Sequence, residues 1–164
     1  MTVYESMLSD YQETDGTATP NAEQEVCQKI ALAGLRRGGF FDHAAFYGGS
    51  CLRLFHGLPR FSEDMDFSLV EKRDDIHLEN YFDAMREEFH IAGFDIEITK
   101  KEKRSFGREE SAFLKENTEA YDIRFQTRKM VKVKIELDTD PPLLFNTELK
   151  LLMKPHSFMT RCFA

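Results

Sequence analysis

Apolar and polar residues alternate along residues 129–138 more cleanly than elsewhere in the chain. One face of this stretch is apolar and is made of Val131, Val133, Ile135 and Leu137. The other face is charged at every second position: Lys132, Lys134, Glu136 and Asp138. A period of two residues is typical of a strand with one face in the core, so we expect a half-buried strand that Pro141-Pro142 ends.

Residues 64–70 alternate in the same way. Three polar side chains share one face of the expected strand: Asp64, Asp66 and Ser68. The opposite face is apolar: Met65, Phe67 and Leu69. Further extended segments are expected at residues 44–47, 94–99, 111–115, 147–154 and 157–163.

Apolar residues at helical spacing predict three helices, at residues 22–37, 50–56 and 77–92. Asn21 is the expected N-cap of the first, Gly38 follows its last turn, and Gly93 ends the third. Strands separated by such helices predict an α+β (α/β) domain with a mixed β-sheet flanked by helices. We place this core domain at residues 22–164, after a helix/loop extension at residues 1–21.

Composition narrows the class of protein. The chain has 164 residues, of which 41% are hydrophobic and 31% charged, as in a globular domain rather than a disordered or membrane protein. Its net charge of −7 disfavours non-specific binding to nucleic acid or to an anionic membrane. The start of the chain lacks the pattern of a secretory signal, and the three cysteines are widely spaced. We therefore expect a cytoplasmic protein with reduced thiols.

The candidate chemistry lies between residues 46 and 70. The segment Gly48-Gly49-Ser50 stands between an expected strand and an expected helix. Glycines allow the backbone to approach a phosphate, and the amides of a helix N-terminus and a serine hydroxyl can donate to it. Such turns are common, so this segment alone is a weak signal.

The pair Asp64-x-Asp66 is more specific. On a strand, both carboxylates project from one face and offer neighbouring oxygen ligands of the kind that Mg²⁺ prefers. A third carboxylate usually completes such a site, and Glu136 or Asp138 can supply it if the two polar-faced strands are neighbours. We favour Glu136; the alternative is a solvated strand face.

Two arginines lie in the same segment. Arg53 and Arg60 are candidates to hold triphosphate oxygens, because a planar guanidinium suits phosphate. The alternatives are a charge on the helix surface, or an ion pair with Glu63 or Asp64.

Taken together, these residues resemble a known signature. Residues 45–69 (AFYGGSCLRLFHGLPRFSEDMDFSL) closely resemble that of the AbiEii/AbiGii nucleotidyltransferases, toxins of bacterial toxin–antitoxin and phage abortive-infection systems in the DNA polymerase β-like superfamily. Residues 31–46 and 132–142 also look like this family. The Gly-Gly-Ser turn followed by Arg-x-Ser-x-Asp-x-Asp is specific, and it includes Ser62.

The resemblance implies an enzyme that uses Mg²⁺ and a nucleoside triphosphate. It implies transfer of a nucleoside monophosphate to an acceptor, which is the 3′ end of tRNA in some relatives and a protein side chain in others. Carried over by position, Gly49 and Ser50 hold the triphosphate, and Asp64 and Asp66 bind metal. Gly48 and Ser62 are further candidates to bind the nucleotide.

The resemblance also raises questions of length and partners. We expect the family's helical C-terminal half to be absent from this sequence, and a cognate antitoxin or a separate C-terminal half to be a partner. One alternative is a non-catalytic module that binds nucleotide or a partner. Another is a phosphotransferase that moves the γ-phosphate.

Overall fold

The computed structural model describes residues 2–11, 19–101, 118–126, 131–140 and 146–163. The described helices are α1 (Val3–Leu8), α2 (Pro20–Arg37), α3 (Gly48–His56) and α4 (Phe82–Ile91). Short 3₁₀ helices lie at Ser9–Tyr11, Phe40–Asp42 and Leu78–Tyr81. The described strands are β1 (Ala44–Tyr47), β2 (Asp64–Leu69), β3 (Ile96–Lys100), β4 (Thr118–Phe125), β5 (Lys132–Asp138), β6 (Thr147–Leu152) and β7 (Phe158–Phe163).

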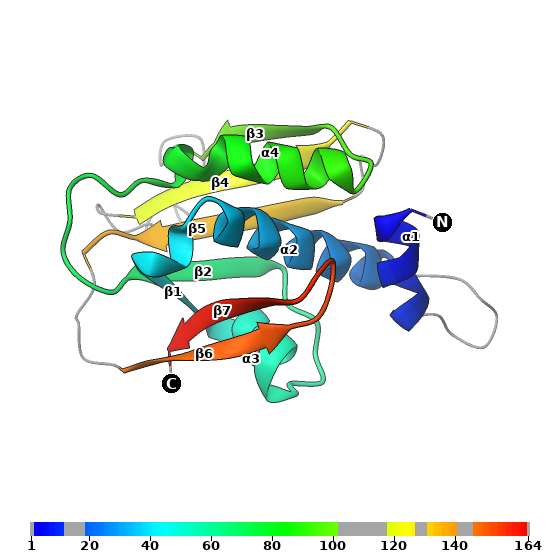
Figure 1. Ribbon diagram of the computed structural model, residues 1–164, viewed down its shortest axis with the longest axis horizontal. Coiled ribbons are helices and arrows are strands. Elements are labelled where there is room, and N and C mark those ends of the chain that lie inside the picture. The colour runs from blue at the N-terminus through cyan, green and yellow to red at the C-terminus, as the bar shows by residue number, and fades with distance from the viewer. Residues whose placement is uncertain (1, 12–18, 102–117, 127–130, 141–145, 164) are drawn as a thin grey trace, which may run out of the picture.

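The described strands form one seven-stranded sheet in the order β3-β4-β5-β2-β1-β7-β6 (Figure 1). Strand β2 runs parallel to β5, and β1 runs parallel to β7. The other neighbours are antiparallel. The sheet is therefore mixed, as the sequence predicts, and β2 and β5 are neighbours near its centre.

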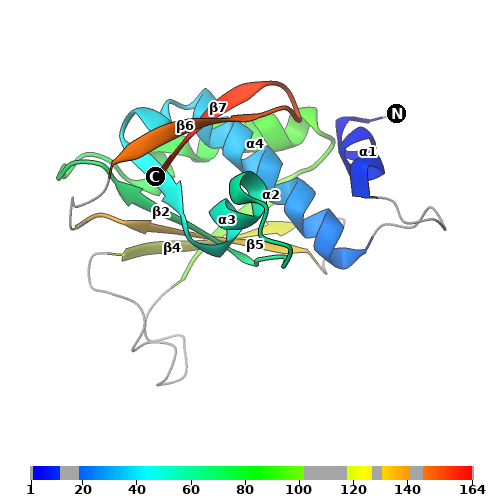
Figure 2. The same cartoon turned by 90° about the horizontal axis from the view of Figure 1, so that it is seen from below.

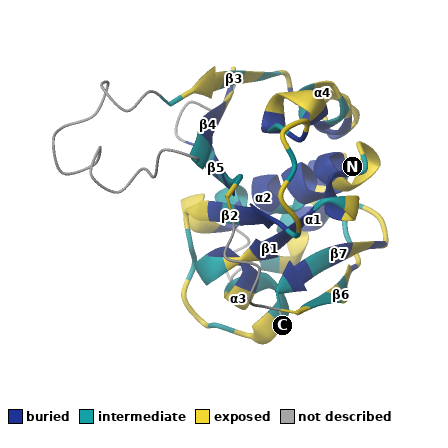
Figure 3. Cartoon of the chain, turned by 90° about the vertical axis from the view of Figure 1, so that its left-hand side faces the viewer, coloured by how far each residue is buried: buried dark blue, intermediate teal, exposed yellow. Residues whose placement is uncertain are grey.

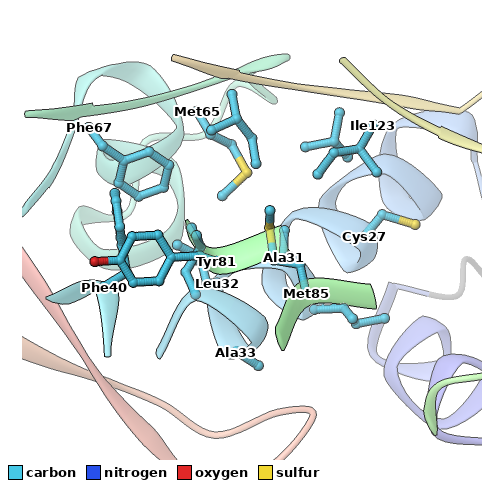
Figure 4. Close-up of a cluster of buried hydrophobic side chains, with 14 of the residues drawn as sticks. Cys27, Ala31, Leu32, Ala33, Phe40, Met65, Phe67, Tyr81, Met85 and Ile123 are labelled. Carbon is cyan, nitrogen blue, oxygen red and sulfur yellow. The ribbon is translucent and has the colours of Figure 1, made fainter. Parts of the chain in front are cut away.

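Helices α2 and α4 lie together on one side of β4 and β5 (Figure 2). Figure 4 shows Met65 and Phe67 of β2 directed toward Leu32 of α2 and Met85 of α4. Helix α2 is buried along most of its length (Figure 3). A Cβ on Gly34 would lie 2.7 Å from the Cα of Met85, so the absence of a side chain lets α2 and α4 approach closely.

The strand alternation predicted from the sequence is confirmed. In β5, buried and half-buried residues alternate along the whole strand. In β2, Met65 and Phe67 are buried, whereas Asp66 between them is half-buried and Asp64 is exposed. Because successive side chains point to opposite faces, Asp66 lies on the face away from the α2–α4 core.

Several local predictions are wrong. Helix α2 is capped by Thr19, whose hydroxyl accepts from the Ala22 amide, and not by Asn21. Pro20 fits at the first helical position because it has no amide hydrogen to satisfy there. Helix α3 begins at Gly48 rather than at residue 50, and the segment predicted as one helix at 77–92 is a 3₁₀ turn followed by α4.

Strand β4 is absent from the predictions made from sequence. Its residues 120–123 are all buried, including Asp122, and it pairs with β3 on one side and β5 on the other. The sequence does carry a strand signal here, because Tyr121, Ile123 and Phe125 alternate with Asp122 and Arg124. The strand expected at 111–115 lies outside the described residues.

The N-terminal helix packs on the rest of the domain. Tyr4 and Met7 of α1 are buried, and the Tyr4 ring meets that of Phe94 edge to face at 4.6 Å between centroids. A Thr2–Glu5 capping box fixes the start of α1. Within the described parts of the chain, no helix has the length and apolar character needed to span a bilayer.

Candidate active site

The parallel pairing of β2 with β5 brings two of the predicted carboxylates together. Asp66 lies directly opposite Glu136 in the register, and Asp64 lies opposite Lys134. The charge of Glu136 acts on Asp66, so the two carboxylates repel each other when both are ionised. Two residues separated by 70 positions in sequence thus form one acidic pair on the sheet face opposite the core.

Nearby positive charge offsets only part of the negative charge of this acidic pair. Burial, and then the charges of Glu136 and Asp64, raise the pKa of Asp66 to about 7. Burial and the charge of Asp64 likewise raise the pKa of Glu136, although Lys101 and Lys134 oppose that shift. A site that retains a proton near neutral pH also favours a cation, because both relieve the same repulsion.

The acidic pair suits Mg²⁺ held jointly with a substrate. In the described ranges, no three His, Cys, Asp or Glu side chains converge to form a complete metal cage. Magnesium commonly keeps its waters and binds one or two carboxylates together with substrate phosphates. Asp66 and Glu136 fit that mode of binding, and Asp64 acts on both of them electrostatically.

The glycines at the start of α3 lie against this pair. Gly48 has a φ of +82°, and a Cβ there would lie 2.7 Å from Oδ2 of Asp66. A Cβ on Gly49 would lie 2.9 Å from the Ser62 hydroxyl. The N-cap residue of α3, Tyr47, makes no side-chain hydrogen bond to the first turn. The structure therefore brings helix amides suited to a phosphate next to the acidic pair.

The two predicted serines are part of the framework around the glycines. Ser50 is fully buried, and its hydroxyl donates to the backbone carbonyl of Asp64, which ties α3 to β2. The carbonyl of Ser62 accepts from the side-chain amide of Gln28 at 2.7 Å, and that of Glu63 accepts from the same amide at 3.3 Å. These contacts hold the segment that leads into β2.

Gln28 itself was missed in the sequence analysis. It is 1% exposed in α2, among apolar neighbours. A polar residue on an apolar helix face was the available signal, because buried polar groups need partners.

Arg53 is already engaged. Its Nε lies 2.9 Å from Oε2 of Glu25, a residue of α2 that is buried. Its Nη1 donates to the carbonyls of Leu58 and Pro59, and its guanidinium lies 4.2 Å from the centroid of the Phe61 ring. The partner is therefore neither Glu63 nor Asp64, the two considered from sequence, and a triphosphate role for Arg53 stays a prediction.

Arg60, in contrast, is exposed. It lines a cavity of about 320 Å³ together with Asn21, Gln24, Pro59, Phe61, Ser62 and Glu63. Two other residues of this lining, Ser62 and Glu63, are those whose carbonyls accept from Gln28. Of the two arginines, Arg60 is the one that the described structure leaves accessible to a ligand.

Tyr47 is a second residue that the sequence analysis missed. It lies opposite Asp66 in the β1–β2 register and is 39% exposed. Burial, and then the charge of Asp66, raise the pKa of its hydroxyl to about 12. Only the register of β1 with β2 shows this proximity.

The two candidates for a third carboxylate differ in their contacts. Asp138 lies opposite Ser68, further along β2 than Asp66, and its Oδ1 accepts from the backbone amide of Asp140 at 2.9 Å. Glu136 faces Asp66 directly. This geometry favours Glu136.

A comparison with protein families gives a match over residues 30–158 to the model described as nucleotidyl transferase AbiEii toxin, type IV TA system. The chain belongs to this AbiEii family. Sequence comparison with the curated proteins gives no match.

Solved structures share the AbiEii fold. The nucleotidyltransferase toxin MenT4 from Mycobacterium tuberculosis H37Rv is 18% identical with a TM-score of 0.60, and the match covers 98% of this chain and 54% of MenT4. JHP933 from Helicobacter pylori is 17% identical with a TM-score of 0.52, covering 90% of this chain and 53% of JHP933. The AbiEii chain thus spans about half the length of these structures.

Proposed function

We propose that this AbiEii chain is a Mg²⁺-dependent nucleotidyltransferase that moves a nucleoside monophosphate from a nucleoside triphosphate to an RNA, such as tRNA, or a protein acceptor. The observation that carries the proposal is the Asp66–Glu136 pair beside Gly48 at the start of α3. Negative charge that favours a cation and helix amides that favour a phosphate meet at this one place.

In the proposed reaction, an acceptor hydroxyl attacks the α-phosphorus in line. The new bond joins the acceptor oxygen to phosphorus, and the hydroxyl proton passes to solvent. The bond from phosphorus to the bridging oxygen breaks, and pyrophosphate leaves with the electron pair. When bound, Mg²⁺ would neutralise phosphate charge and make the acceptor hydroxyl more acidic.

The chain's own residues position the reactants. Asp66 and Glu136 would hold the cation, with Asp64 adding negative charge. The backbone at Gly48 and Gly49 would leave room for the triphosphate at the α3 amides, and Arg60 would interact with its outer charge. Positioning and charge neutralisation would supply most of the rate acceleration.

As a toxin of a type IV system, the protein would act with a cognate antitoxin. The three cysteines are buried and none is in a disulfide, which agrees with a reducing compartment such as the cytoplasm. The family description and the name of MenT4 support the toxin role.

A second candidate function is a module that binds nucleotide or a partner without turnover. The chain spans about half the length of the solved structures that it matches, and Arg53 is engaged with Glu25. With Arg53 held by Glu25 and by backbone carbonyls, fewer cationic groups of the described residues are available to bind a triphosphate.

The test is label transfer to total cell RNA and to protein with Mg²⁺. Label from α-labelled nucleotide is expected on one acceptor, and label from γ-labelled nucleotide on neither. Asp66→Asn is expected to abolish transfer, and Asp95→Asn, an exposed aspartate outside the site, is the matched control. Nucleotide binding by calorimetry without transfer would favour the binding module. Transfer from γ-labelled nucleotide would indicate a phosphotransferase, and full activity of Asp66→Asn would contradict the proposed site.

A further inference from the structure

Strand β6 ends the described sheet and exposes a row of apolar side chains. Leu149 is 60% exposed, Leu151 54% and Met153, just beyond the strand, 63%. Met159 of β7 lies opposite Leu151 in the register and is 38% exposed. We refer to these four residues as the β6 apolar row. Large apolar side chains that gather on one face are typical of a contact surface.

The other edge of the same sheet is different. Strand β3 exposes Glu97, Thr99 and Lys100, so charged side chains line this edge. Charges on an edge strand discourage pairing with another chain. The two edges therefore differ in the property that controls edge-to-edge association, and only β6 combines an edge position with an apolar row among the described strands.

We propose that β6 pairs with β6 of a second copy of this chain, antiparallel about a two-fold axis at Leu149. Such an interface is isologous, and it joins two sheets into one. Leu149 then lies opposite Leu149 of the second copy. Glu148 lies opposite Lys150 of the second copy, and Lys150 lies opposite its Glu148, so the strand is complementary to itself in charge.

Neighbouring registers do not share this complementarity. An axis at Lys150 places two lysines directly opposite each other, which is unfavourable. A shift of one residue places the apolar face of one strand beside the polar face of the other. In the proposed dimer Leu149 packs against Leu149 of the second copy, and the pairing of Glu148 with Lys150 selects the register.

The charges needed for this register are accessible. Glu148 and Lys150 form an ion pair within the strand at 3.4 Å, and their side chains are 40% and 35% exposed. An exposed ion pair of this kind is weak. Replacing it with Glu148–Lys150 pairs between the two copies therefore costs little free energy. Strands β7 and β1 separate β6 from β2, so the interface lies away from the Asp66–Glu136 pair. The inference does not depend on the proposed function.

Charge exchange between the copies provides the test. Wild-type chain is expected to sediment at twice its mass of 19.1 kDa. Glu148→Lys places Lys opposite Lys150, and Lys150→Glu places Glu opposite Glu148, so each variant alone is expected to dissociate at least about tenfold more readily. An equimolar mixture of the two variants is expected to recover the dimer, because each opposite pair is then of unlike charge.

Two controls make the result specific. Glu97→Lys introduces the same charge change on the β3 edge and is expected to leave the dimer intact. Thermal unfolding of each variant by circular dichroism confirms that the monomers are folded. Monomeric wild-type chain at high micromolar concentration would overturn the proposal, as would single variants that remain dimeric or a mixture that stays monomeric.

Discussion

The acidic and basic sides of the candidate site are built in opposite ways. On the acidic side, Asp66 and Glu136 lie face to face on neighbouring strands, and the pKa of each is raised. On the basic side, Arg53 is paired with buried Glu25 and also donates to backbone carbonyls. The two carboxylates therefore repel each other without a cation between them. The Arg53 guanidinium, in contrast, already makes an ion pair and two hydrogen bonds within the fold.

The difference shows that residue type within a motif does not determine a residue's role. Asp66 and Arg53 lie in the same short segment, and both are of a type suited to phosphate chemistry. Their partners separate them: repulsion between carboxylates favours a ligand, whereas a satisfied ion pair favours stability. Four measurements test whether the two sides of the site differ in this way.

Of these four measurements, the largest effect is expected on nucleotide transfer when Glu136 is replaced. Glu136→Gln removes half of the acidic pair and is expected to lower nucleotide transfer by about 10²–10³-fold, the loss typical of one well-placed group that stabilises charge. Asp138→Asn, on the same face of the same strand, is expected to stay within about threefold because Asp138 is engaged with the Asp140 amide. If Asp138→Asn lowered the initial rate of transfer more than Glu136→Gln, then Asp138 would be the third carboxylate.

The second largest effect is expected on the free energy of unfolding when Arg53 is replaced. Arg53→Ala removes the ion-pair partner of buried Glu25, which keeps its hydrogen bond from the Tyr11 hydroxyl, and is expected to lower the free energy of unfolding by about 2–3 kcal/mol. Arg60→Ala, at an exposed position, is expected to change it by less than about 0.5 kcal/mol and to weaken nucleotide binding instead. Urea unfolding and calorimetric titration of both variants measure this. Equal stability losses would remove the distinction between the two arginines.

Gly48→Ala tests the contact between the glycine turn and the acidic pair. The new Cβ would approach Asp66 and would also occupy a left-handed backbone conformation, so a loss of about 1–2 kcal/mol and reduced transfer are expected. Gly57→Ala is the matched control, since φ there is +76° but a Cβ meets nothing within 4 Å. It is expected to lose stability and to keep transfer. Equal transfer in the two variants would show that Gly48 matters for backbone conformation alone.

The smallest effect is the pH dependence of stability. Because folding raises the pKa of Asp66 from its usual value of 3.8 to about 7, the folded state holds a proton that the unfolded state has released. The metal-free protein is therefore expected to lose about 1 kcal/mol of stability as pH rises from 4 to 8, after allowance for solvent screening. Thermal unfolding of Asp66→Asn is expected to show a flatter profile. An unchanged profile would show that the acidic pair is compensated after all.

The sequence by itself determined the local elements of this protein. Alternation fixed the buried and polar faces of β2 and β5, and the spacing of Asp64 and Asp66 placed both on one polar face. The Gly-Gly-Ser turn and the residues around it were sufficient to indicate the AbiEii family. Such features depend on residues within a few positions of one another, where periodicity is read directly.

Only the tertiary structure decided which distant residues meet. The register of β2 with β5 pairs Asp66 with Glu136, and the packing of α2 gives Arg53 its partner Glu25 and the Ser62 segment its donor Gln28. Strand register and side-chain pairing are set by contacts between segments far apart in the chain, and local periodicity carries no record of them.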